Sequence, residues 1–206
     1  MEMPRLEDSS IPIVRCPAST MAVDEPPPEL SSQVQVRIPP RLANKLAYYK
    51  GPLFKVVLAP RGWTCNQYAG TGASTFLIAP DGAGVLRAEQ YPGPQIAVRV
   101  AIGATSGRFE VAKISARLFS ILSDFIERVR GEKLDEISDE PFPGDTYYYL
   151  SPTVVKWDAQ PTGDGVVGLA YLSGHKAEPT LTLMQVRLGA DSQELVPAIL
   201  GREISE

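Results

Sequence analysis

The prolines at the start of the chain constrain its fold more than any other feature. Eight of the 19 prolines lie in the first forty residues, where they exclude a long helix and favour extended backbone; they are Pro4, Pro12, Pro17, Pro26, Pro27, Pro28, Pro39 and Pro40. We therefore predict an arm over residues 1–40, disordered at 1–10 and otherwise packed on the domain that follows. Within the arm, residues 11–14 are apolar enough to form an edge strand. Residues 34–38 alternate apolar and polar side chains, as a half-buried strand does.

Residues 41–206 are predicted to form a single α+β domain, with a mostly antiparallel sheet and one long amphipathic helix. The helix is expected over residues 110–130, because apolar residues recur there at spacings of three and four and Gly131 follows as a stop; the apolar residues are Val111, Ile114, Leu118, Ile121, Leu122, Phe125, Ile126 and Val129. We expect this face to pack on the sheet. A partner-binding helix is the alternative.

Two shorter helices are expected near the ends of the domain. Residues 40–50 place Leu42, Leu46 and Tyr49 on one helical face. Near the C-terminus, Asp191 and Glu194 fit a capping box before an apolar helix that ends at Gly201. Pro197 is expected to kink that helix or delay its start.

Strands account for most of the remaining pattern. The clearest alternation is at 95–102, and buried strands are expected at 54–58 and 76–79. In the C-terminal part we expect one strand through 146–157 and an antiparallel hairpin of 166–172 with 180–188. Strands, helix, strands and helix follow one another without strict alternation, which favours α+β over a doubly wound parallel sheet.

A turn with a tryptophan and a cysteine follows the strand at 54–58. Pro60 and Gly62 suit positions i+1 and i+3 of a type I turn, with Arg61 exposed between them. Trp63 and Cys65 come directly after the turn.

The chain has two cysteines, Cys16 and Cys65, and one histidine, His175, too few to suggest a zinc site. A disulfide and a pair of buried thiols both fit these residues. A disulfide closing a loop of about 50 residues would contribute roughly 4 kcal/mol on the chain-entropy model. Cys65 with His175 is the one conceivable Cys-His pair, and a structural role for Cys65 is the better interpretation.

Charge and motifs argue against several classes of function. The net charge is −4 and the sequence has no basic stripe, so no nucleic-acid partner is expected. No apolar run reaches the roughly 20 residues that a transmembrane helix needs. The sequence lacks the glycine-rich, P-loop, zinc-protease and G-x-S-x-G motifs. The acidic stretch 132–145 lacks the residue order of a calcium-binding EF-hand. We therefore expect no cofactor and no metal.

Aromatic residues give the best candidates for binding. Tyr147, Tyr148 and Tyr149 are consecutive, so a strand would direct them to both of its faces. The candidate binding residues are Arg61, Trp63, Tyr147, Tyr148, Tyr149, Trp157 and His175. The alternative is that the tyrosines pack with their hydroxyls at the rim and that His175 is an exposed turn residue.

Three segments together resemble a known family. Arg15-Cys16-Pro17, the block Ala59-Pro60-Arg61-Gly62-Trp63-Thr64-Cys65 and the segment Ser151-Pro152-Thr153-Val154-Val155-Lys156-Trp157 are similar to an uncharacterised family of secreted bacterial proteins, best represented in actinobacteria. The resemblance implies an extracytoplasmic location and a disulfide between Cys16 and Cys65. It implies no activity.

We therefore predict a non-enzymatic binding or interaction module for a protein or small-molecule ligand, and leave its oligomeric state open. The alternative is a small pocket enzyme, hydrolase or cyclase-like. Such an enzyme would use tyrosines or carboxylates, the latter from Asp145, Asp158 and Asp164, and a pocket where Asp, Tyr and His175 converge would favour it.

Overall fold

The computed structural model describes residues 6–20, 24–25, 33–52, 56–70, 73–82, 93–102, 146–158, 166–175 and 178–204. The chain divides into two compact units. The first comprises Met1–Ala69, Phe76–Ala97 and Leu188–Glu206, and the second comprises Gly70–Thr75 and Val98–Arg187. The first forty residues therefore belong to the same unit as the segments that follow them.

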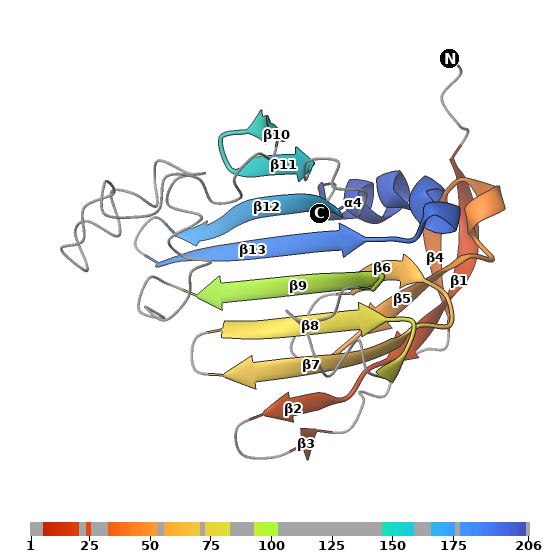
Figure 1. Ribbon diagram of the computed structural model, residues 1–206, viewed down its shortest axis with the longest axis horizontal. Helices are drawn as coiled ribbons and strands as arrows, with labels where there is room; N and C mark the ends of the chain where they lie inside the picture. The colour runs from red at the N-terminus through yellow and green to blue at the C-terminus, as the bar shows by residue number, and fades with distance from the viewer. Residues whose placement is uncertain are drawn as a thin grey trace. The chain divides into compact units, whose positions relative to one another are not determined.

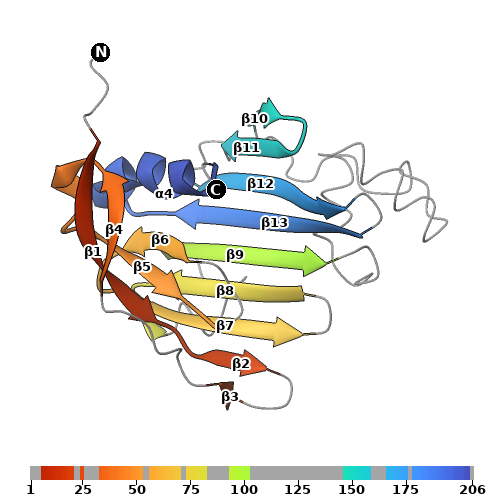
Figure 2. The ribbon, with the colours of Figure 1, turned by 180° about the vertical axis from the view of Figure 1, so that it is seen from behind.

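The first unit contains a four-stranded sheet in the order β4-β1-β5-β6. Its strands are β1 (Glu7–Arg15), β4 (Gln33–Ile38), β5 (Leu46–Lys50) and β6 (Val57–Pro60). β1 pairs antiparallel with β4 through its first six residues and parallel with β5 through its last three, so it lies between them (Figure 2). The predicted strands at 11–14 and 34–38 are confirmed. β1 begins at Glu7, inside the segment that we expected to be disordered.

β5 replaces most of the short helix predicted over residues 40–50. Pro40–Leu42 form one 3-10 turn, η1, and the chain then enters the sheet. Leu46, Ala47, Tyr48 and Tyr49 are buried in succession, which a strand covered on both faces allows and an amphipathic helix does not. The helical spacing of Leu42, Leu46 and Tyr49 was therefore misleading.

Further strands of the first unit lie in the order β9-β8-β7-β2-β3 (Figure 1). They are β2 (Ala18–Thr20), β3 (Asp24–Glu25), β7 (Thr64–Gly70), β8 (Ala73–Ala79) and β9 (Gln95–Ile102), of which β8 and β9 also contribute residues to the second unit. β9 confirms the strand predicted at 95–102. Leu77, Ala79 and Ala97 form a buried cluster on which Tyr68 packs.

The second unit contains strands in the order β10-β11-β12-β13. They are β10 (Thr146–Ser151), β11 (Val154–Asp158), β12 (Val166–His175) and β13 (Glu178–Arg187), and each pairs antiparallel with the next. The predicted hairpin of the last two strands is confirmed. Residues 146–157 form two strands and not one, because the chain reverses at Pro152 and Thr153.

The C-terminal helix belongs to the first unit and begins later than its sequence pattern indicated. The 3-10 helix η4 (Ala190–Leu195) leads into α4 (Val196–Ile204), so Pro197 lies in the first turn, where its missing N–H is tolerated. The N-cap of η4 is Gly189, without a side-chain hydrogen bond. The predicted capping box is thus wrong: Glu194 instead binds Lys45, just before β5.

The α+β fold class is wrong for this protein. Strands dominate the described residues, and α4, nine residues long, is the single α-helix among them. The long helix predicted over 110–130 lies outside the described residues. No helix in the described part of the chain is long and apolar enough to cross a membrane.

Candidate functional site

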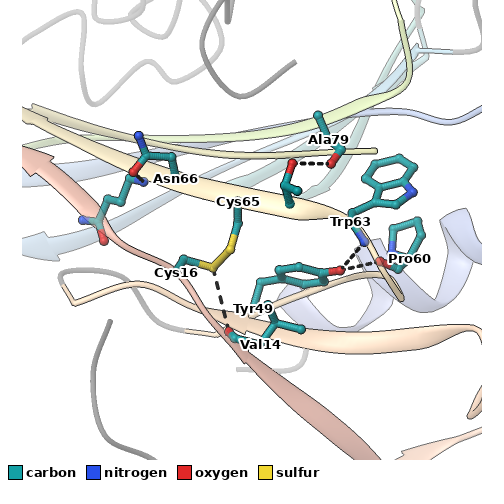
Figure 3. Close-up of a disulfide and its surroundings, with 10 residues drawn as sticks. Val14, Cys16, Tyr49, Pro60, Trp63, Cys65, Asn66 and Ala79 are labelled. Atoms are coloured by element: carbon teal, nitrogen blue, oxygen red, sulfur yellow. Dashed lines mark hydrogen bonds between the residues drawn. A yellow bond between two sulfur atoms is a disulfide. The ribbon is translucent and has the colours of Figure 1, made fainter. Parts of the chain in front are cut away.

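The turn after β6 is held by a buried tyrosine (Figure 3). Gly62 has a φ of 87°, a left-handed backbone conformation that glycine adopts without strain. The Tyr49 hydroxyl donates to the Pro60 carbonyl at 2.7 Å and accepts from the Trp63 amide at 3.0 Å, so one side chain joins both ends of the turn. Burial raises the pKa of Tyr49 to about 12, although the backbone hydrogen bonds oppose the shift. Tyr49 therefore stays protonated near neutral pH.

Cys16 and Cys65 form a disulfide, with their Cα atoms 5.4 Å apart. Cys16 is fully buried, and its amide donates to the Lys50 carbonyl, which continues the ladder of β1 and β5. Cys65 lies on β7, so the bond joins the two groups of strands of the first unit (Figure 3). Neither sulfur carries a thiol, and Cys65 has no nucleophile to offer to His175.

Arg61 and Trp63 flank Gly62 and differ in exposure. Arg61 is exposed, and its amide donates to the Lys45 carbonyl at 2.8 Å. Trp63 is half-buried, and Thr64, which follows it, donates from its hydroxyl to the Ala79 carbonyl. The turn is thereby fixed to Lys45, just before β5, on one side and to β8 on the other, and Arg61 is exposed.

The other aromatic candidates lie in the second unit. Tyr147 pairs with Trp157 across β10 and β11, and Trp157 pairs with Gly168 on β12. Trp157 is 1% exposed, and its ring lies where a side chain on residue 168 would be: a Cβ there would be 1.9 Å from the ring. Trp157 is therefore a packing residue and takes no part in an exposed surface.

Three consecutive residues of β10 have large, exposed apolar side chains. The exposed fractions of Tyr148, Tyr149 and Leu150 are 45%, 64% and 50%. We call these three residues the β10 surface. Successive strand residues point to opposite faces, so Tyr148 and Tyr149 expose both faces of the strand. Leu150 was not a candidate in the sequence, although it continues the same strand pattern.

Charges beside the β10 surface are paired with each other. The Lys156 ammonium lies 5.3 Å from the centre of the Tyr148 ring and forms an ion pair of 3.1 Å with Asp158. The Lys156 interaction with the ring is a cation–π contact. Asp158, a carboxylate candidate in the sequence, thus has a cationic partner.

His175 is separated from the tyrosines along the sheet. It pairs with Glu178 at the end of the β12–β13 hairpin, five residues beyond Ala170, which is level with Tyr149 across β11; five residues correspond to about 17 Å of strand. Asp145 and Asp164 lie outside the described residues. Within the described ranges, no three His, Cys, Asp or Glu side chains are grouped as a metal site would require.

Comparison of the chain with protein-family models, curated proteins and solved structures finds no match.

Proposed function

We propose that this protein is a non-enzymatic binding module that makes its contacts through the β10 surface. The observation that carries the proposal is the run of three consecutive large apolar side chains exposed on one strand. Single exposed apolar residues are ordinary on protein surfaces, whereas several close together are more typical of interaction sites. Tyrosine is enriched at such sites because its ring is apolar and its hydroxyl remains hydrated.

The neighbouring residues support a fixed recognition surface. Tyr147 of β10 lies opposite Trp157 of β11, and Trp157 is packed against Gly168. Lys156 holds one face of the Tyr148 ring. A partner would therefore meet aromatic side chains that are already positioned, which lowers the entropy lost on binding.

We also propose that the protein works outside the cytoplasm. Disulfides persist in oxidising compartments, and Cys16–Cys65 is of this kind. Fractionation of the native host cells tests the location. Recovery of the protein only in the cytoplasm, with both cysteines reduced, would contradict this part of the proposal.

Site-specific photocrosslinking tests the β10 surface as the contact site. The photoreactive residue p-benzoylphenylalanine replaces Tyr149 in one variant and the exposed Gln35 of β4 in a matched control. We expect discrete adducts in the native host at position 149 and not at 35. An excess of unlabelled wild-type protein should suppress them, whereas the Tyr148→Ser, Tyr149→Ser variant should not. The same adducts at both positions, or none at 149, would overturn the proposal.

A further inference from the structure

The β10 strand differs from the other strands that end a sheet among the described residues. An edge strand presents backbone N–H and C=O groups to solvent, and proteins protect it with charge, proline, short length or a covering element. β4 exposes Gln33, Gln35 and Arg37, and two prolines follow it. β6 ends in Pro60 and packs against α4, and β3 consists of two acidic residues. Each of these three edges is therefore protected.

Of these protections, charge and proline are absent from β10 itself, although Pro152 follows it directly. Its sequence, Thr146 to Ser151, contains no charge and no proline, and its aromatic side chains favour strand pairing. The register shift against β11 falls between Tyr149 and Ser151, so pairing is regular from Thr146 to Tyr149. The ligand chemistry that matches such an edge is another extended polypeptide strand.

The sequence of β10 favours a second copy of β10 as the strand that pairs with this edge. Tyr147-Tyr148-Tyr149 reads the same in both directions, so an antiparallel copy centred on Tyr148 places tyrosine opposite tyrosine at all three positions. Residues directly opposite in an antiparallel pair lie on the same face of the sheet, so each tyrosine in this register is beside a tyrosine of the second copy on the same face. Aromatic pairs across strands are among the favourable ones.

The charge around β10 permits a second copy to approach. The chain carries a net charge of −4, which opposes self-association in general. β10 itself is uncharged, and the neighbouring Lys156 is neutralised by Asp158. Within the described residues, β10 and β11 together therefore carry no net charge.

We propose that two copies of this protein associate through antiparallel pairing of their β10 strands, with Tyr148 opposite Tyr148 of the second copy. This inference rests on the proposed function and names a second copy of the protein as the partner that binds the β10 surface. A six-residue strand buries less area than the roughly 1,600 Å² of a standard interface, so the dimer forms weakly and depends on concentration.

Sedimentation equilibrium of the purified, oxidised protein over a concentration series tests the pairing. The wild type should shift from monomer to dimer as the concentration rises. Tyr148→Lys places like charges opposite each other and should lower the association constant by about tenfold or more. The control Gln35→Lys on β4 should leave it unchanged. Circular dichroism checks that each variant is folded.

A charge-swap experiment tests the register. Tyr148→Lys and Tyr148→Glu should each be monomeric alone, and an equimolar mixture should form a heterodimer, since each lysine then faces a glutamate. A wild type that stays monomeric, a Tyr148→Lys variant that dimerises as well as wild type, or a mixture without heterodimer would overturn the inference. If the protein does not dimerise but position 149 still gives saturable adducts to a different protein, the binding function stands. The β10 surface then binds that protein and not a second copy. Failure of both experiments would remove both proposals.

Discussion

The Tyr49 hydroxyl and the Trp63 amide are hydrogen-bonded at 3.0 Å, and through this bond a residue of β5 fixes the turn that leads to the disulfide. Because the hydroxyl also donates to the Pro60 carbonyl, Tyr49→Phe would leave a buried carbonyl and amide without this partner. We expect the variant to lose about 1–3 kcal/mol of unfolding free energy, measured by urea denaturation. Tyr148→Phe, on an exposed ring, is the matched control and should be nearly neutral. Equal stabilities of the two variants would contradict this role.

The same tyrosine predicts a loss of stability in alkaline solution. Burial raises its pKa to about 12 in the folded protein, against 10.0 ordinarily, so the folded state retains a proton that the unfolded state releases. The contribution is fully present below pH 10 and declines as the pH rises from 10 to 12, by roughly 2–3 kcal/mol. Urea denaturation at several pH values measures it. Tyr49→Phe should show a shallower decline over that interval, and identical slopes in the two proteins would refute the assignment.

The strand that the sequence predicted best is β9. In residues 95–102 large apolar side chains alternate with smaller or polar ones, and this pattern placed the strand although Ile96, Ala97 and Val98 are all buried. β5 is the opposite case, because Leu46 to Tyr49 are buried on both faces and show no period of two. β7 was missed because Thr64–Gly70 is rich in polar residues, and its pairing with neighbouring strands decides its conformation.

In the candidate site, too, the sequence could predict the placement of some residues and not of others. The exposure of Tyr148 and Tyr149 on opposite faces follows from strand alternation, so the sequence indicated it. The burial of Trp157 does not follow, since it depends on Gly168, eleven residues away, leaving room for the ring. No local pattern marks Tyr49 as the link across a turn formed more than ten residues later.

A substitution at Gly168 of β12 tests the packing of the Trp157 ring of β11. A Cβ at this position would lie 1.9 Å from the Trp157 ring, so Gly168→Ala should displace the ring and lower stability by about 1–3 kcal/mol. Gly189→Ala is the control, because no atom lies within 4 Å of its Cβ position, and its effect should stay within about 0.5 kcal/mol. Thermal unfolding followed by tryptophan fluorescence measures both. A neutral Gly168→Ala would show that Trp157 is packed differently.

The disulfide supplies the last prediction. It joins residues 49 apart in the sequence, and on the chain-entropy model removing it costs about 4 kcal/mol. We expect a loss of this order for the Cys16→Ser, Cys65→Ser double variant in urea denaturation. The wild type should also resist alkylation until it is unfolded and reduced, as intact mass reports, because it holds no free cysteine and Cys16 is fully buried. Because the bond joins β7 to the end of β1, its loss should weaken the first unit, and hydrogen exchange should rise most in β1, β2 and β7. A uniform rise in exchange across both units would show that the bond acts only by restricting the unfolded chain, and that it does not stabilise these strands in particular.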